Sequence, residues 1–372
     1  MNLSDIFCQS KAIGSLQRAF ACGKVAHAYL FAGPDGVGRF ATACAWAKLL
    51  LCKSPAEAGG FADSCNRCSS CQAFESGSHP DFVHVYKELI RFTKNRQNAA
   101  KTPIDLPIDV IKEFLVEKAS GRPLLSDSKV YVISESEKLN IPSQNALLKV
   151  LEEPPGHCFI ILLCTKLENL LDTTQSRCQI IRFSGIDEQK IIEKLVSAGF
   201  DEIEARYWAR FTEGSLGKSM EFAQLRNEKI SFYDIKVSLI DRLSRKKLSD
   251  AVDFASWINA SVKNLVEIWT KHSPETSKKD LARQVNRAVI SMVVFVLSDV
   301  MKGQFVAESE FVNFDQPDKI EALCRFFSPE DAALLIEACY ESIRWVDAAV
   351  NEKLIFEHLL INIASSDKIE IL

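Results

Sequence analysis

Four cysteines have a spacing that suits a metal ion. Cys52, Cys65, Cys68 and Cys71 form the pattern C-x12-C-x2-C-x2-C. Two-residue gaps allow neighbouring thiolates to face one ion, and a fourth cysteine completes a tetrahedron. The residues between them are mostly polar, which argues against a simple core position. An iron–sulfur cluster could use the same ligands, but a closed site of four thiolates fits structural zinc better.

A glycine-rich turn has the spacing of a phosphate-binding P-loop. Gly33, Gly36 and Gly38 precede Arg39 and Phe40, where the intact motif has Lys followed by Ser or Thr. The lysine reaches the outer phosphates and the hydroxyl binds magnesium. Arginine keeps the charge on a wider fork, and phenylalanine supplies no ligand. We therefore expect a degenerate P-loop, and whether it still binds nucleotide is open at this stage.

A second segment resembles the acidic end of an ATPase strand. The apolar run Val130–Ile133 leads into Ser134 and Glu135. In a Walker B motif the run ends in Asp-Glu, where Asp helps to hold magnesium and Glu prepares the attacking water. Ser134 stands at the Asp position, while Glu135 remains. Because Phe40 and Ser134 both lack the usual magnesium ligand, we expect that this chain does not hydrolyse ATP.

The elements that position these residues alternate between strand and helix. Short apolar runs at 28–32, 81–86, 129–134, 158–164 and 179–183 read as strands separated by helical segments. This order favours a parallel sheet covered by helices on both faces. After about residue 185 only helical patterns follow. We expect an α/β domain over 1–184 with an inserted module near 52–75, a small helical lid over 185–222 and a helical domain over 223–372.

Composition narrows the function classes. The 372 residues carry 45 Lys and Arg against 49 Asp and Glu, a net charge of −4. A protein that grips DNA alone through phosphates is usually basic. No secretion signal is visible and no apolar run reaches membrane-spanning length, so we expect a cytoplasmic protein with no membrane contact. The basic stretch with Arg91, Lys94, Arg96 and Lys101 reads as an exposed loop, with DNA contact as the alternative.

Longer motifs carry a resemblance to a known family. The segment from Asn145 to Pro155, NALLKVLEEPP, is close to a signature of clamp-loader ATPase subunits, as is Ser176-Arg177-Cys178. The segments 26–31 and 79–81 also fit. Together they resemble the gamma/tau and delta-prime subunits of the bacterial DNA polymerase III clamp loader over about residues 8–220. Beyond that, the resemblance is one of general helical character.

This resemblance implies a fold, a metal and partners. It implies an AAA+ domain, with a RecA-like parallel sheet and flanking helices, followed by a helical lid and an all-α collar. It adds weight to zinc at the four cysteines and implies that Arg177 acts in trans as an arginine finger on ATP bound by a neighbouring subunit. The implied partners are gamma/tau and delta subunits. The sliding clamp and primer-template DNA would be met through the assembly.

The departures from the motif separate two members of the family. A chain that keeps the finger but lacks Lys, Ser/Thr and Asp resembles delta-prime, whereas gamma/tau subunits have intact motifs. The ATPase subunits usually carry an arginine sensor at the position of Gly217, so this glycine also favours a resemblance to delta-prime. The alternatives are an active gamma/tau-type ATPase subunit and a zinc-dependent nucleic-acid-binding protein. The absent hydrolytic residues argue against the first, and the acidic net charge argues against the second.

Overall fold

The computed structural model describes residues 1–58, 61–94, 104–228, 230–245, 250–272, 276–303, 305 and 307–365. Its chain divides into two compact units. The first comprises Met1–Ile186 with Ser215–Gly217, and the second comprises Asp187–Gly214 with Lys218–Leu372. The three-part division with boundaries at 184 and 222 stays a prediction.

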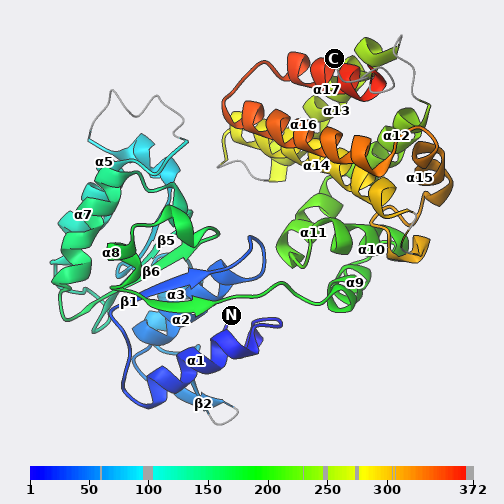
Figure 1. The fold of residues 1–372 in the computed structure, drawn as a ribbon. Coiled ribbons are helices and arrows are strands. Elements are labelled where there is room, and N and C mark those ends of the chain that lie inside the picture. The colour runs from blue at the N-terminus through cyan, green and yellow to red at the C-terminus, as the bar shows by residue number, and fades with distance from the viewer. Residues whose placement is uncertain are drawn as a thin grey trace. The chain divides into compact units, whose positions relative to one another are not determined.

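A parallel sheet forms the centre of the first unit (Figure 1). Its strand order is β4-β5-β6-β1-β7, and each neighbouring pair is parallel. The strands are β1 (Ala28–Ala32), β4 (Phe82–Val85), β5 (Lys129–Ile133), β6 (Cys158–Cys164) and β7 (Gln179–Arg182). All five lie where the apolar runs predict them. With helices on both faces, the sheet confirms the AAA+ class expected from the resemblance.

The two faces of the sheet contribute to separate cores. Successive side chains of a strand point to opposite faces, so Val130 and Val132 of β5 pack in one core with Trp46. Tyr131 and Ile133 of the same strand pack in the other core with Leu147. Every residue of β1 is buried, as expected for an inner strand that is covered on both sides.

Helices of the first unit cover these two cores. The first core contains residues of α1 (Ser10–Ala21) and α2 (Arg39–Leu51), and the second contains residues of α5 (Ile108–Ile111) and α7 (Ile141–Glu152). Helix α5 continues through a π-helical turn, Lys112–Val116, into α6 (Glu117–Ala119). The short α8 (Asp172–Gln175) lies between β6 and β7.

The inserted module has more regular structure than its sequence predicts. Two short strands, β2 (Ala56–Ala58) and β3 (Phe61–Asp63), pair antiparallel. Helix α3 (Ser69–Glu75) follows, with Cys68 as its N-cap residue. The four cysteines therefore lie at the end of α2, after β3 and at the start of α3.

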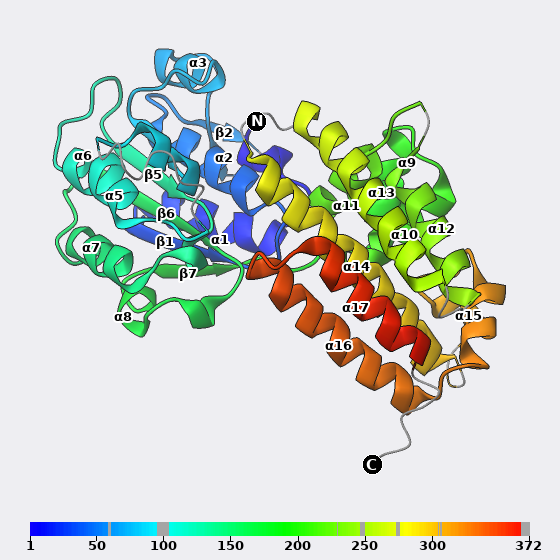
Figure 2. The ribbon, with the colours of Figure 1, turned by 90° about the horizontal axis from the view of Figure 1, so that it is seen from above.

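The second unit is helical throughout its described residues, apart from an isolated β-bridge between Arg226 and Ser231. Figures 1 and 2 both show α14, α16 and α17 side by side, in agreement with their contacts. Side-chain caps fix several helix starts, for example Ser328, which forms a capping box with Asp331. The principal helices are α9 (Glu188–Ser197), α10 (Glu202–Phe211), α11 (Leu216–Gln224), α12 (Phe232–Ser244), α13 (Ala251–His272), α14 (Lys278–Lys302), α15 (Pro317–Cys324), α16 (Pro329–Asp347) and α17 (Glu352–Ser365).

Helix α14 is the one described helix that is long and apolar enough to cross a membrane by length and composition. Its uninterrupted apolar stretch, around Met292–Leu297, is shorter than a membrane span, in line with the sequence analysis. Of its most apolar window, 61% is buried inside the fold. It also buries the polar side chains of Asn286 and Asp299. Such burial is typical of a core helix, so the helix is weak evidence for a membrane span.

Candidate functional site

The P-loop segment joins β1 to α2 and depends on its glycines. A Cβ atom at Gly33 would lie 2.4 Å from the carbonyl oxygen of Phe183, which leaves no room for a side chain. Gly38 has a φ of 101° and is the N-cap residue of α2. Positive φ values in this range favour glycine. The glycine spacing noticed in the sequence therefore reflects a tight loop with the expected connection from strand to helix.

Arg39 is turned back onto this loop. Its Nε donates to the carbonyl oxygen of Pro34 at 3.1 Å, and its Nη2 lies 3.4 Å from Asp35. The residue is only 8% exposed. A lysine in the intact motif reaches the outer phosphates, whereas this guanidinium has loop atoms as partners.

Phe40 belongs to a cluster that the sequence reading did not find. Its ring lies 4.7 Å from the ring of His84, and His84 lies 4.9 Å from the ring of Tyr86. The Nε2 atom of His84 is 2.8 Å from the hydroxyl oxygen of Ser134. The two positions that would hold magnesium are therefore bridged by an imidazole. We call Phe40, His84, Tyr86 and Ser134 the aromatic cluster.

The charge state of His84 suits this packing. Burial lowers the pKa of the imidazole to about 4, because a charged ring would lose its hydration. Near neutral pH the ring is therefore uncharged, and it can either donate to or accept from the Ser134 hydroxyl. A neutral imidazole packed at a tilt against Phe40 brings no negative charge to attract a magnesium ion.

Glu135 is constrained by neighbouring cations. It follows β5 in a left-handed conformation with a φ of 51°. Its carboxylate forms a close ion pair with Lys138, and the ammonium of Lys87 lies 3.8 Å away. A carboxylate that prepares water for attack must offer its oxygen to that water. Here the carboxylate already has two lysine partners.

Most residues of the predicted nucleotide site line one cavity of about 410 Å³, although Gly33 is not among them. Gly36 and Gly38 come from the loop, Arg39 from the start of α2, and Ser134 and Glu135 from the segment that follows β5. Gly217 also lines the cavity, and its backbone N–H donates to the carbonyl oxygen of Gly36 at 2.8 Å. A Cβ atom at Gly217 would lie 2.9 Å from the Cα atom of Gly36, so only glycine fits this approach.

The four cysteines converge as their spacing predicts. Their sulfur atoms all lie within 4.8 Å of one another. The Cys52 and Cys68 sulfurs are 4.0 Å apart, and those of Cys65 and Cys71 are 3.9 Å apart. Tetrahedral zinc with sulfur ligands at about 2.3 Å requires sulfur separations of roughly 3.8 Å. The cluster could therefore hold a metal ion such as zinc.

Backbone N–H groups support thiolates in this cluster. The amides of Cys65, Cys68 and Cys71 donate to the sulfurs of Cys52, Cys65 and Cys68, each at 3.4 Å. Burial raises the pKa of Cys68, but backbone and thiol hydrogen bonds outweigh it and lower the pKa to about 6. A thiol of low pKa is readily deprotonated, and metal ligation requires the thiolate.

A buried lysine ties this module to α2. Lys48 is 1% exposed and forms close contacts with Asn66 and Glu75. The hydrogen bond from Lys48 and the N-terminal ammonium hold the pKa of Glu75 at about 2. The module is therefore fixed to the helix by an ion pair as well as by its cysteines.

His79 belongs to a structural network beside the cysteines. Its Nε2 lies 2.9 Å from the Ser70 hydroxyl, and its Nδ1 accepts from the backbone of Asp81 at 3.1 Å. Asp81 in turn accepts three backbone N–H groups from residues 124–126. Both ring nitrogens therefore have partners within the chain.

Arg177 lies outside the cavity, between α8 and β7. Its Nη2 atom is 2.7 Å from Glu152 Oε1, and its Nη1 atom donates to the carbonyl oxygen of Thr173 at 2.9 Å. The side chain is 34% exposed. The neighbouring Cys178 packs against the core, and burial raises its pKa to about 12. Arg177 is a predicted site residue, whereas no motif in the sequence indicates Glu152 as its partner.

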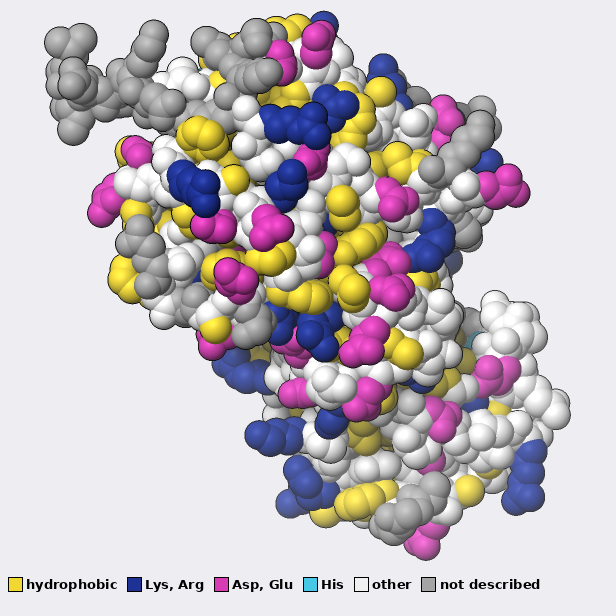
Figure 3. Space-filling model, turned by 90° about the vertical axis from the view of Figure 1, so that its right-hand side faces the viewer, with side chains coloured by type: hydrophobic (Ala, Val, Ile, Leu, Met, Phe, Trp, Pro, Cys, Tyr) yellow, Lys and Arg dark blue, Asp and Glu magenta, His cyan; other side chains and the backbone are white. Residues whose placement is uncertain are grey.

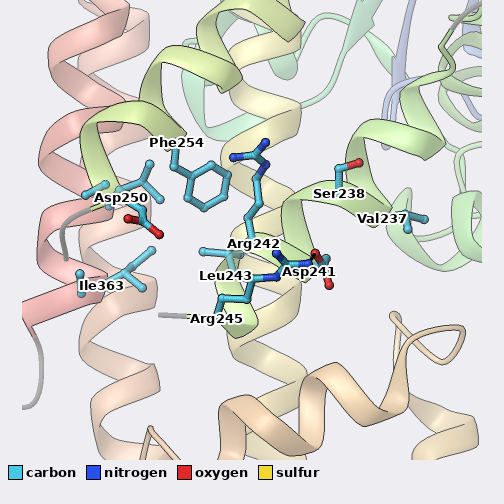
Figure 4. Close-up of a pocket in the computed structure, with 12 residues that line it drawn as sticks. Val237, Ser238, Asp241, Arg242, Leu243, Arg245, Asp250, Phe254 and Ile363 are labelled. Carbon is cyan, nitrogen blue, oxygen red and sulfur yellow. Dashed lines mark hydrogen bonds and ion pairs between the residues drawn. The ribbon is translucent and has the colours of Figure 1, made fainter. Parts of the chain in front are cut away.

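A second cavity, of about 500 Å³, lies in the helical unit between α12, α13 and α17 (Figure 4). Arg242 lies beside the ring of Phe254 and 4.7 Å from the ring of Trp257. Asp241 pairs with Arg245 at 2.6 Å and with Lys319 at 2.7 Å. These lining charges already have partners within the fold.

Charges are mixed on the visible surface. Figure 3 shows Lys and Arg side chains interspersed with Asp and Glu, without a broad single-sign field on that face. Of the predicted basic stretch, Arg91 lies in a 3-10 helix and Lys94 pairs with Glu117 at 3.2 Å. Arg96 and Lys101 lie outside the described residues.

Comparison with known proteins places the chain in a family. The family described as DNA polymerase III, delta subunit, matches residues 8–187, and its C-terminal counterpart matches residues 245–365. The delta-prime subunit of DNA polymerase III from Bacillus subtilis is 25% identical over 358 residues, which cover 95% of both chains. The matches therefore extend along most of the sequence.

Two further relatives have higher identity over shorter stretches. The delta-prime subunit from Pseudomonas aeruginosa is 37% identical over 179 residues, covering 47% of this chain and 48% of that protein. The tau subunit from Bacillus subtilis is 32% identical over 232 residues, covering 61% of this chain and 38% of that protein. With both family matches, these similarities show that the chain belongs to the DNA polymerase III clamp-loader family that includes the delta-prime, gamma and tau subunits.

Proposed function

We propose that this chain is a non-hydrolysing, delta-prime-like subunit of a replicative clamp loader. It helps to load a sliding clamp onto primed DNA and supplies Arg177 to the ATP site of a neighbouring subunit. Its partners are gamma/tau and delta subunits, and it acts in the cytoplasm without its own catalysis. The helical region over 223–372 serves as the collar that holds the assembly together.

The aromatic cluster is the observation that carries this proposal. Phosphoryl transfer in P-loop proteins needs magnesium held by a hydroxyl and a carboxylate. Phe40 and Ser134 occupy those positions, and His84 connects them at 2.8 Å from Ser134. Arg39 and Glu135, the two charged groups that remain, are paired within the chain. Each of these contacts favours a site without hydrolysis.

Arg177 retains what a finger needs. A finger acts by placing a guanidinium against charge that develops on a phosphoryl group of another subunit. Arg177 is 34% exposed and is held at an element end. Its position in the Ser-Arg-Cys motif supports the assignment.

Zinc is the proposed ion of the four-cysteine module. The sulfur separations are close to those of a tetrahedral site, and cysteine fills all four positions. A site without an open position holds structure and performs no catalysis. We propose that zinc fixes the module between α2 and α3.

An active gamma/tau-type ATPase is the alternative that the tau relative favours, because its identity to this chain is 32%. That function requires magnesium in the cavity, and the aromatic cluster opposes it. A zinc-dependent nucleic-acid-binding function would require a basic surface, whereas the chain is slightly acidic.

Replacement of Arg177 tests the proposed function. The loader should be reconstituted with intact-motif ATPase subunits and either wild-type chain or Arg177→Ala. We expect a complex of normal composition whose steady-state ATPase falls, with a loss of about a thousandfold at the site that the finger serves. Arg177→Lys should restore little, because an ammonium cannot reproduce the planar fork.

The exposed Arg182 on β7 provides a matched control. Arg182→Ala removes the same type of side chain from a nearby position and should leave the ATPase unchanged. An unaltered rate in the Arg177→Ala complex would exclude the finger role.

A further inference from the structure

Arg177 is held by a carboxylate from another element. Glu152 is the last residue of α7, and its Oε1 atom lies 2.7 Å from Arg177 Nη2. The second contact, from Nη1 to the carbonyl oxygen of Thr173, spans 2.9 Å. Helices α7 and α8 are in contact (Figure 1). The guanidinium is therefore fixed at two nitrogen atoms by two different helices.

Helix physics gives no reason for a carboxylate at this place. The C-terminal end of a helix carries partial negative charge, so an acidic residue there is unfavourable. Glu152 and Glu153 both stand at this end of α7, and both are exposed. Among the described residues Glu152 pairs with Arg177, whereas no ion pair of Glu153 is found. The pair with Arg177 offsets the cost of the charge at Glu152.

The contact leaves the guanidinium able to act. An arginine side chain has five N–H donors in a rigid plane. Glu152 contacts one terminal nitrogen and Thr173 accepts from the other, so these two contacts engage a minority of the five donors. Both contacts fix the plane of the fork before a partner arrives. Preorganisation of this kind reduces the side-chain entropy that a long arginine loses when it binds.

We propose that Glu152 is a positioning residue that preorganises Arg177 for insertion into the ATP site of the neighbouring subunit. This inference rests on the proposed finger role of Arg177. Glu152 does not touch the nucleotide. It acts by holding the guanidinium plane in the orientation from which it meets the phosphoryl group.

The size of the effect follows from exposure. Side-chain exposures are 34% for Arg177 and 49% for Glu152, so water screens the pair. Exposed ion pairs are weak. Loss of the contact that orients Arg177 should therefore lower the ATPase rate by roughly two- to fivefold. The effect of Glu152 should therefore be much smaller than that of Arg177.

Three variants in the reconstituted loader test this proposal: Glu152→Ala, Glu153→Ala and Arg177→Ala. Glu153→Ala is the matched control, because it removes the same charge one residue away. We expect Glu152→Ala to lower the maximal ATPase rate by about two- to fivefold with little change in the KM for ATP. Glu153→Ala should leave both unchanged.

Two further measurements separate positioning from a structural role. Removal of a carboxylate from a helix C-terminus is not expected to lower the thermal stability of the isolated chain. In the Arg177→Ala background, Glu152→Ala should have no additional effect on the ATPase, since no finger remains to be positioned. Glu152→Asp should restore part of the rate.

The outcomes distinguish this inference from the proposed function. If Arg177→Ala lowers the ATPase but Glu152→Ala behaves like Glu153→Ala, Glu152 has no positioning role while the finger stands. An increased rate with Glu152→Ala would mean that the pair restrains Arg177, and it would overturn the proposal. If Arg177→Ala itself has no effect, the finger assignment fails.

Discussion

The two ends of helix α2 have opposite characters. At its N-terminal end, Phe40 stands where a magnesium ligand belongs and packs on His84. At its C-terminal end, Cys52 joins three other cysteines in a complete ligand set. One helix therefore connects a site where Phe40 offers no metal ligand with a cluster whose four cysteines could hold a metal ion. Neighbouring sites in a shared scaffold can thus diverge independently, because each depends on its own few side chains.

The largest effect is expected at the cysteine end. Cys68→Ser removes one of four thiolates and should abolish binding of one zinc ion per chain. Structural zinc sites of this kind contribute about 10 kcal/mol or more of apparent binding free energy. Elemental analysis of protein purified without chelators measures the loss, and limited proteolysis between Cys52 and Cys71 should become faster.

The exposed Cys22 provides the control, because Cys22→Ser changes a thiol outside the cluster. That variant should keep its zinc and its resistance to protease. If wild-type protein contains no metal, the prediction is wrong, and the two ends of α2 do not differ in metal binding.

At the N-terminal end of α2, Phe40 supplies no magnesium ligand, so we expect no ATP turnover by the isolated chain. Replacing Phe40 with Thr and Ser134 with Asp restores two oxygen ligands but leaves Arg39 on the loop and His84 in place. We expect this double variant to remain inactive in a steady-state phosphate-release assay. Turnover of about one per second, the lower range for kinases, would contradict this expectation. It would mean that the two missing magnesium ligands alone account for the inactivity.

The smallest expected effect is a pH dependence from His84. Its pKa is about 4 in the folded chain because of burial, whereas an unfolded histidine titrates near about 6.5. Between these values the unfolded state binds more protons, so stability decreases as the pH falls. The contribution reaches at most about 1.4 kcal/mol per pH unit in that window.

Urea denaturation at pH 7 and pH 5 measures this effect in wild-type chain and in His84→Phe. The phenyl ring can keep the contacts with the rings of Phe40 and Tyr86 but does not titrate, so the variant should lose less stability on acidification. His79, whose pKa burial also lowers, is present in both proteins. Equal losses in the two proteins would show that His84 does not cause the dependence.

Most of the sheet could be predicted because its strands are continuous apolar runs. The predicted strand at 158–164 coincides with β6, and the others differ from the structure by no more than a residue at either end. The cysteine cluster was also predictable, since two-residue spacing confines neighbouring thiolates to a small volume. These features depend on residues that are near one another in the sequence.

Contacts across elements could not be predicted in the same way. His84 meets Ser134 because β4 pairs with β5 in a register that places His84 opposite Val132. Glu152 meets Arg177 because α7 and α8 pack together. Neither residue belongs to a motif that implies its partner, and the pairing requires the strand order and helix packing.

The approach of Gly217 to Gly36 bears on the evolutionary history of the chain. A side chain at Gly217 would collide with the loop, because its Cβ would lie 2.9 Å from the Gly36 Cα atom. Under the proposed non-hydrolysing function, an active ATPase would require an arginine at this position, a displaced loop and changes at Phe40, His84 and Ser134. Because these changes involve several elements at once, the proposed dependence on ATP bound by neighbouring subunits would be difficult to reverse.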